Sequence, residues 1–155
     1  MDVSVVITCH EKYRNLLPVA IQSVEKQNIN FKNKIIVCDN MPPLNEIKGW
    51  DIIYGSWSNP NPARNEGLNR INSKWVVFLD ADDFLDDGYF SCLNEDIPRK
   101  IACLYPNIKY PDEIFNTPEW NYWTLREYNF VDTSSIWRKD ALTSIGGWTN
   151  PNANL

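Results

Sequence analysis

The chain has 155 residues, of which 43% are hydrophobic and 23% charged, enough for one domain with a buried core. Its formal net charge of −5 argues against a nucleic-acid backbone or an anionic membrane surface as partner. No apolar run approaches the length of a transmembrane helix, no basic leader precedes the first apolar stretch, and the four cysteines lack paired spacing. We therefore expect one domain over residues 1–155, in a reducing, cytoplasmic compartment, with buried free thiols at Cys9 and Cys38; peripheral membrane association stays open.

The first forty residues predict a strand, a helix and a second strand. Residues 3–8 are apolar and β-branched, residues 34–38 repeat that pattern, and apolar residues recur at helical spacing between them. Pro18 fits only the first turn of that helix, which we therefore start near Asn15 and end near residues 27–28. Such a βαβ unit has parallel strands and a right-handed crossover.

The next stretch predicts a weak helix at 44–48, a short strand at 52–54 and a helix at 63–71. We expect Asn61 as the N-cap of the last helix and Pro62 at its first position. Arg64 then lies in the first turn, where the helix dipole disfavours a cation. Its position predicts an anionic partner, either a phosphate or an aspartate.

The most informative stretch begins at residues 75–79, an apolar run typical of a strand buried between two layers. Five carboxylates follow within eight residues: Asp80, Asp82, Asp83, Asp86 and Asp87. Like charges this close repel, so a divalent cation that takes carboxylate and phosphate oxygens is the simplest compensation. The alternative is a solvated acidic turn that caps the next helix, although a cap needs one aspartate and not five.

The remaining chain predicts further α/β structure and no second domain. The expected elements are a short helix at 88–93, a strand at 101–105 that continues through 108–110, a long loop at 111–129, a strand at 131–137 and a helix at 138–145 ended by two glycines. Residues 149–155 are polar and without pattern. Four tryptophans outside the expected strands either line a cleft or pad the core: Trp57, Trp120, Trp123 and Trp148.

Three expected strands end in polar or acidic residues, at 8–11, 39–40 and 80–83. In a parallel sheet these ends meet at one edge, where open α/β folds bind their ligands. For a nucleotide ligand, this edge would offer separate acids to the base, the sugar and a metal.

At this point the chain resembles the inverting family 2 glycosyltransferases of GT-A fold. The resemblance rests on the ordered set of residues 3–10, 37–40, 62–68, 78–83 and 138–148, and it spans residues 2–149. It implies a GT-A fold, a Rossmann-like α/β/α sandwich with a mostly parallel sheet. It also implies a nucleotide-diphosphate sugar donor, with UDP as the expected carrier, a Mn²⁺ or Mg²⁺ ion, and a direct displacement that inverts the anomeric carbon.

The resemblance also implies roles for individual residues. Asp39 matches the acid that bonds the base, and Arg64 matches the arginine near the donor phosphates. The first strand's Thr8, His10 and Glu11 match the corner that packs around the nucleoside. A DxD pair is formed by Asp80, near the ribose and the metal, and Asp82 on the metal, which Asp83 could share.

Two departures from the family pattern matter. Cys38 stands where members usually carry Asp, and no acid follows Asp140, although members carry an acid pair shortly after the position of Trp148. One acid of that pair is the general base that deprotonates the acceptor hydroxyl. We therefore expect no catalytic base within this chain, its acceptor part to be incomplete, and the base to lie beyond Leu155.

Several alternatives are weaker. A haloacid dehalogenase-type phosphatase also places DxD after a strand, but it expects Thr or Val where this chain has Phe84. Calcium loops, dinucleotide oxidoreductases and nucleotidyltransferases each require a glycine or a ligand residue that this chain lacks at the matching position. A non-catalytic nucleotide-sugar-binding domain remains open. The acceptor, whether carbohydrate, lipid or protein, and the oligomeric state do not follow from the sequence.

Overall fold

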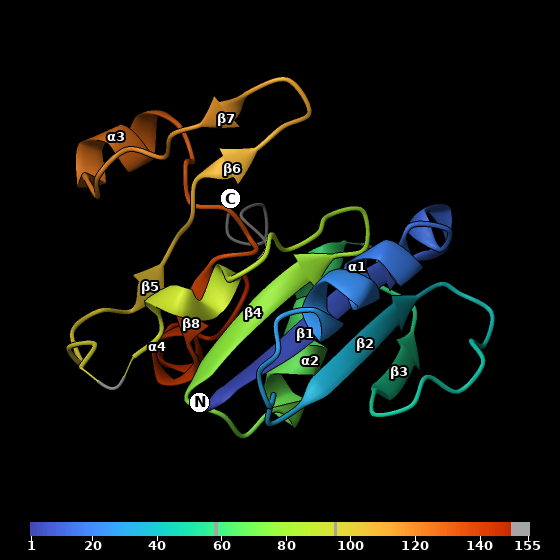
Figure 1. Ribbon diagram of the computed structural model, residues 1–155. Helices are drawn as coiled ribbons and strands as arrows, with labels where there is room; N and C mark the ends of the chain where they lie inside the picture. The colour runs from blue at the N-terminus through green and yellow to red at the C-terminus, as the bar shows by residue number, and fades with distance from the viewer. Residues whose placement is uncertain (58, 95, 150–155) are drawn as a thin grey trace.

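A computed structural model describes residues 1–57, 59–94 and 96–149. Figure 1 shows a twisted central sheet with helices on both faces. Six strands form this sheet in the order β3-β2-β1-β4-β8-β5. In chain order they are β1 (Val3–His10), β2 (Lys34–Asp39), β3 (Asp51–Gly55), β4 (Trp75–Asp80), β5 (Cys103–Leu104) and β8 (Ile136–Arg138).

The four strands β3, β2, β1 and β4 are mutually parallel, as the apolar runs predicted. Their register places Thr8 beside Asp80 and His10 beside Asp39, so the polar strand ends do meet at one edge. Strand β8 runs antiparallel to both β4 and β5. The sheet is thus mostly parallel, and the predicted α/β fold is confirmed.

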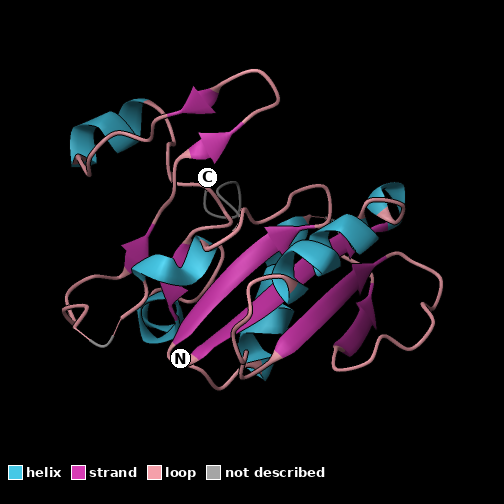
Figure 2. Cartoon of the chain, in the orientation of Figure 1, coloured by secondary structure: helices cyan, strands magenta, loops and turns pink. Residues whose placement is uncertain are grey.

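Alternate residues of the strands fill two separate cores. On one face, α1 (Leu17–Glu25) packs Leu17, Ala20 and Val24 against the sheet. On the other face, α2 (Pro60–Arg70) and α4 (Lys139–Ser144) contribute Ala63, Leu68 and Leu142. Figure 2 shows the resulting three layers, which match the α/β/α sandwich expected from the sequence.

Helix starts differ from the predictions by a few residues. Helix α2 begins at Pro60 instead of residue 63, because Asn59 is the N-cap: its side chain accepts a hydrogen bond from the backbone N–H of Asn61. The sequence repeats Asn-Pro twice here, and the structure uses the first pair. Helix α1 begins at Leu17 without a side-chain cap from Asn15, although Pro18 lies in its first turn as expected.

Two predicted elements are shorter than expected, and one is missing. Residues 41–47 are irregular, so the weak helix predicted at 44–48 was wrong. The helix predicted at 88–93 is a short 3-10 helix, Tyr89–Cys92, and another covers Glu11–Tyr13. The strand predicted at 131–137 is only the three residues of β8, because the side chain of Asp132 bonds the backbone of Ser134 and bends the chain before it.

The stretch between β5 and β8 departs most from the prediction. Residues 108–110 do not continue β5: β6 (Ile108–Lys109) pairs with β7 (Ile114–Phe115) in a separate two-stranded sheet. The expected loop at 111–129 holds β7 and a short helix, α3 (Tyr122–Glu127), capped by Asn121. In Figure 1 these elements project from the main sheet.

The buried thiols agree with the sequence. Cys9 and Cys38 are buried and free, as predicted, and burial raises the pKa of the Cys9 thiol to about 12. Within the described residues, no helix combines the length and the apolar character needed to cross a membrane.

Candidate functional site

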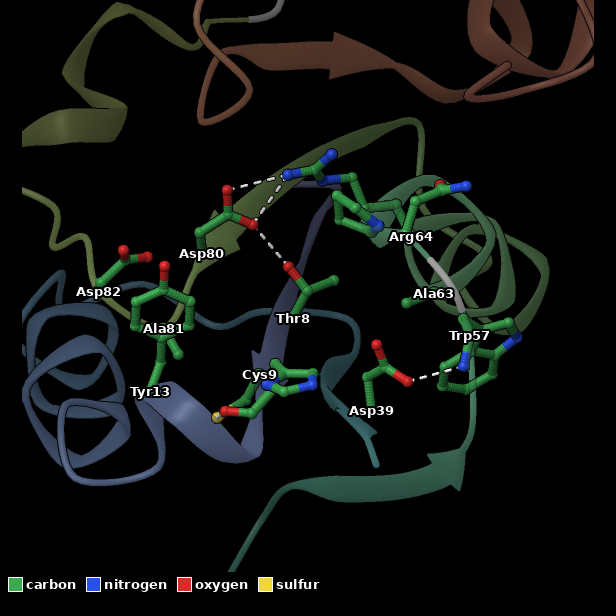
Figure 3. A pocket seen from close by; sticks show the side chains of 13 residues that line it. Thr8, Cys9, Tyr13, Asp39, Trp57, Ala63, Arg64, Asp80, Ala81 and Asp82 are labelled. Carbon is green, nitrogen blue, oxygen red and sulfur yellow. Dashed lines mark hydrogen bonds and ion pairs between the residues drawn. The ribbon is translucent and has the colours of Figure 1, made fainter. Parts of the chain in front are cut away.

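A cavity of about 390 Å³ lies at the carboxyl ends of β1, β2 and β4, beside the N-terminus of α2 (Figure 3). Six of the eight residues predicted from the sequence line it: Thr8, His10, Asp39, Arg64, Asp80 and Asp82. Glu11 and Asp83 are not among its lining residues. The fold thus brings most of the candidate residues together at the sheet edge where α/β folds bind ligands.

A three-residue network organises one wall of the cavity. The hydroxyl of Thr8 donates a hydrogen bond to Asp80 Oδ1 at 2.6 Å, across the β1–β4 pair. Arg64 Nη2 donates to both carboxylate oxygens of Asp80, at 2.9 and 2.8 Å. These bonds fix the orientation of the Asp80 side chain, and Asp80 is the anionic partner that the unfavourable helix position of Arg64 predicted.

Arg64 is only 7% exposed, and its guanidinium still has unused hydrogen-bonding capacity. Its Nη1 donates to Asn61 Oδ1 at 3.0 Å, whereas its Nε is buried without a hydrogen-bond partner among the described residues. A buried donor without an acceptor costs about 1–3 kcal/mol. Arg64 is thus charged, largely desolvated and incompletely bonded at the rim of a cavity, which suits it to contact an anionic ligand.

Asp39 lies on the opposite side of Thr8 from Asp80 (Figure 3). It is 8% exposed, and its Oδ1 accepts hydrogen bonds from the backbone N–H of Trp57 at 2.7 Å and from Asn40 Nδ2 at 3.0 Å. The loop after β3 therefore fixes the Asp39 carboxylate. No described residue bonds its Oδ2, which leaves this oxygen able to accept from a ligand N–H.

His10 and Glu11, at the end of the first strand, differ in their position relative to the cavity. His10 is exposed at the cavity mouth, where its Nδ1 accepts a hydrogen bond from the backbone N–H of Lys12 at 3.2 Å. Glu11 is not among the lining residues and forms an exposed ion pair with Arg14 at 3.7 Å. The position of Glu11 gives no geometric support for the expected nucleoside contact.

The acidic run is compensated in different ways along its length. Asp80 is paired with Arg64, and Asp86 forms an exposed ion pair with Lys109 at 3.3 Å. Among the described residues Asp83 has no such partner: burial, together with the charges of Asp80, Asp82 and Asp132, raises its pKa to about 6. The repulsion expected from the sequence is therefore evident at Asp83.

A metal ion fits this site only as part of a ligand complex. In the described part of the chain, no group of three or more His, Cys, Asp or Glu side chains is arranged to hold one. Mg²⁺ and Mn²⁺ sites often use one or two carboxylates and complete their shell with substrate phosphate and water. Asp82 lines the cavity next to Asp80, so these two residues match that smaller donor set.

Several lining residues were not predicted from the sequence. Tyr13, Asn59 and Ala63 reach the cavity through their positions in the β1–α1 connection and the start of α2. Trp57, one of the four tryptophans left open, lines the cavity and packs closely on Gly55, where a Cβ would lie 2.3 Å from the ring. Its position after a strand that ends at the same edge was the available signal.

Comparison with known proteins places the chain among sugar-transferring enzymes. It is 35% identical over 86 residues to the minor teichoic acid biosynthesis protein GgaB of Bacillus subtilis (strain 168). The aligned region covers 48% of this chain and 10% of GgaB. Crystal structures with a similar fold include S. aureus TarS 1-349 in complex with UDP, with a TM-score of 0.63, 14% identity, and coverage of 97% of this chain and 50% of that one.

A second similar structure is the mannosyltransferase PcManGT from Pyrobaculum calidifontis in complex with GDP-Man and Mn²⁺. Its TM-score is 0.64 at 10% identity, over 94% of this chain and 47% of that one. The chain thus spans about half the length of these solved structures. The model of the family described as "Glycosyl transferase family 2" matches residues 4–148, nearly the whole chain, and the chain therefore belongs to glycosyl transferase family 2.

Proposed function

We propose that the cavity binds a nucleoside diphosphate sugar, with UDP as the carrier, and that this domain serves transfer of the sugar to an acceptor hydroxyl with inversion. The observation that carries the proposal is the Thr8–Asp80–Arg64 network at the ends of parallel strands, with Asp39 and Asp82 on the same cavity. The UDP complex of TarS supports uridine, and the GDP-Man complex of PcManGT makes guanosine the alternative.

Each residue has a task that its geometry suits. Asp39, fixed by Trp57 and Asn40, offers its second oxygen to the base. Asp80 faces the sugar of the nucleoside and is held in place by Arg64. Arg64 lines the cavity and brings its positive charge to the diphosphate. A bound Mn²⁺ or Mg²⁺, held by Asp82 and Asp80, would stabilise the negative charge that develops on the leaving diphosphate.

The proposal leaves the acceptor and the general base outside the described cavity. We propose a carbohydrate, lipid or protein hydroxyl as the acceptor, and we assign the general base to none of the described residues. We also place the domain in the cytoplasm, which its free cysteines support. Membership in glycosyl transferase family 2 argues against the haloacid dehalogenase-type phosphatase.

Calorimetric titration with UDP, with and without Mn²⁺, tests this proposal on the wild type and on Asp82→Ala. We expect metal-dependent binding that Asp82→Ala weakens at least tenfold, about 1.4 kcal/mol. Asp87→Ala is the matched control, because Asp87 belongs to the same acidic run and does not line the cavity. If the folded wild type binds neither UDP nor GDP, CDP or dTDP, the proposal is wrong.

A further inference from the structure

Helix α2 contacts a distant segment of the chain as well as the cavity. Asn65 Nδ2 donates a hydrogen bond to the backbone oxygen of Trp148 at 2.8 Å, and Asn65 Oδ1 accepts from the backbone N–H of Trp148 at 2.7 Å. One turn earlier, Asn61 Nδ2 donates to the backbone oxygen of Thr149 at 2.7 Å. Two amide side chains of α2 therefore fix the backbone of residues 148–149.

The indole of Trp148 contacts the guanidinium of Arg64. The guanidinium carbon of Arg64 is 5.5 Å from the centre of the Trp148 ring, within the range of a cation–π contact. The same ring packs edge-on against Phe78 and Trp137, each at 5.4 Å between centroids. Arg64 is thus packed between the carboxylate of Asp80 and the indole of Trp148.

Trp148 is not held by its own side-chain hydrogen bond. Its Nε1 is buried and has no hydrogen-bond partner in the described part of the chain. Ring packing and the two backbone bonds to Asn65 therefore fix its position. The hydrogen bonds from Asn65 are directional, so they determine the position of the Trp148 backbone.

The preceding residue allows this close approach. Gly147 has φ +80°, and a Cβ there would lie 2.4 Å from Asn65 Oδ1. Any other residue would clash with the Asn65 amide and strain the backbone. The contact between Asn65 and the backbone of Trp148 therefore requires glycine at position 147.

We propose that Asn65 is a positioning residue of the nucleotide-sugar site, which acts through Trp148 on Arg64. By holding the Trp148 backbone, Asn65 keeps the indole against the guanidinium, and the guanidinium in turn stays on Asp80 and at the cavity rim. This inference rests on the proposed function, because its effect is on binding of the nucleotide. It assigns a role in ligand binding to a side chain that does not line the cavity.

Calorimetry with UDP and Mn²⁺ on single and double variants tests the inference. Asn65→Ala should weaken UDP binding roughly threefold to tenfold, the size of a lost cation–π contact. Asn69→Ala, an exposed asparagine of the same helix, is the matched control and should bind as the wild type does. In an Arg64→Ala background, Asn65→Ala should cause no further loss, because Asn65 acts through Arg64.

Trp148→Leu, made with and without Arg64→Ala, keeps the test independent of the folding of Asn65→Ala. Trp148→Leu keeps the backbone bonds and removes the aromatic face, so it should weaken UDP binding similarly, and only when Arg64 is present. Equal UDP affinity of the wild type and Asn65→Ala, or an equal loss with and without Arg64, overturns the inference while the proposed function stands. A folded wild type that binds none of UDP, GDP, CDP and dTDP overturns the proposed function, and this inference with it.

Discussion

At the scale of single residues, Arg64 is the side chain on which most of the cavity depends. Its two terminal nitrogens contact different partners, Asp80 through Nη2 and Asn61 through Nη1. A lysine carries the same charge on one nitrogen and cannot reproduce this planar, two-sided contact. The geometry, and not the charge alone, is therefore what the site requires.

We accordingly expect Arg64→Lys to bind UDP at least fivefold more weakly and to lose about 1–2 kcal/mol of unfolding free energy, the cost of one imperfect charged hydrogen bond. Calorimetry and urea unfolding measure the two effects. Arg70→Lys on the same helix is the control, since Arg70 forms only an exposed pair with Glu66. Wild-type behaviour of Arg64→Lys would show that a point charge suffices.

Asp83 makes stability depend on pH. Burial and neighbouring carboxylates raise its pKa from 3.8 to about 6, so its ionised form is disfavoured in the folded state. The folded state therefore loses stability as pH rises from about 4 to about 6, and it does not regain it above that range. Below pH 4 the group is protonated in both states and contributes no difference.

Asp83→Asn should therefore be more stable than the wild type at pH 7.5 and equally stable near pH 3.5, without added metal. The gain should be on the order of 1 kcal/mol, or about 2–4 °C in Tm, because Asp83 is exposed enough for solvent to screen much of the repulsion. Thermal unfolding across this pH range checks it, with Asp87→Asn as the control. A gain that does not change with pH would point to a cause other than ionisation.

At the scale of elements, α2 joins the cavity to the second core. Gly67 faces β1, and a Cβ there would lie 2.4 Å from Val6 Cγ1. Val6 is fully buried, so its side chain has little room to move. This glycine lets the helix approach the strand closely enough for Arg64 to reach Asp80.

Gly67→Ala should destabilise the fold by about 1–3 kcal/mol through overpacking, although alanine normally favours a helix over glycine. Urea unfolding measures this, with Asn69→Ala as the control in the same helix. The penalty should shrink when Val6→Ala is also present, because that change removes the clashing methyl groups. A stabilising Gly67→Ala would contradict the close contact.

The elements also show what the sequence can and cannot predict. Strands β1, β2 and β4 were predicted because each is a continuous apolar run, and those runs also placed Thr8, Asp39 and Asp80 at one edge. Helix α3 and strand β7 were missed because they are short, polar in part and without periodicity. The Asn65–Trp148 contact was not predictable, since its partners are 83 residues apart and one is backbone.

At the scale of the whole molecule, binding and turnover can be separated. The cavity that we assign to the donor lies within residues 8–82, whereas we assign the general base to none of the described residues. General acid–base catalysis contributes about 10²- to 10⁴-fold to rate. We therefore expect a chain of residues 1–155 to bind the donor without efficient transfer.

We expect this chain to bind UDP but to turn over a UDP-sugar donor slowly. With UDP-GlcNAc, the donor bound in a TarS complex, the rate of UDP formation should be about 10²- to 10⁴-fold lower than that of complete family members. A coupled assay for UDP release measures the rate, and Asp82→Ala gives the background. Turnover at the family's normal rate would show that a residue of this chain serves as the base. Donor binding without transfer in a longer form of the protein would instead favour a non-catalytic binding domain.

The long separations within the site have a consequence for its synthesis. Thr8 and Asp80 are 72 residues apart, and Asn65 and Trp148 are 83 apart, so the cavity wall and its support close at different times as the chain leaves the ribosome. The parallel strands β1, β2 and β4 can pair first, but the packing contact between Arg64 and the Trp148 indole forms only after residue 148 emerges. Domains form as their segments become available, so a nascent chain that has not yet exposed residue 148 holds the Asp80–Arg64 pair without the indole packing that supports it.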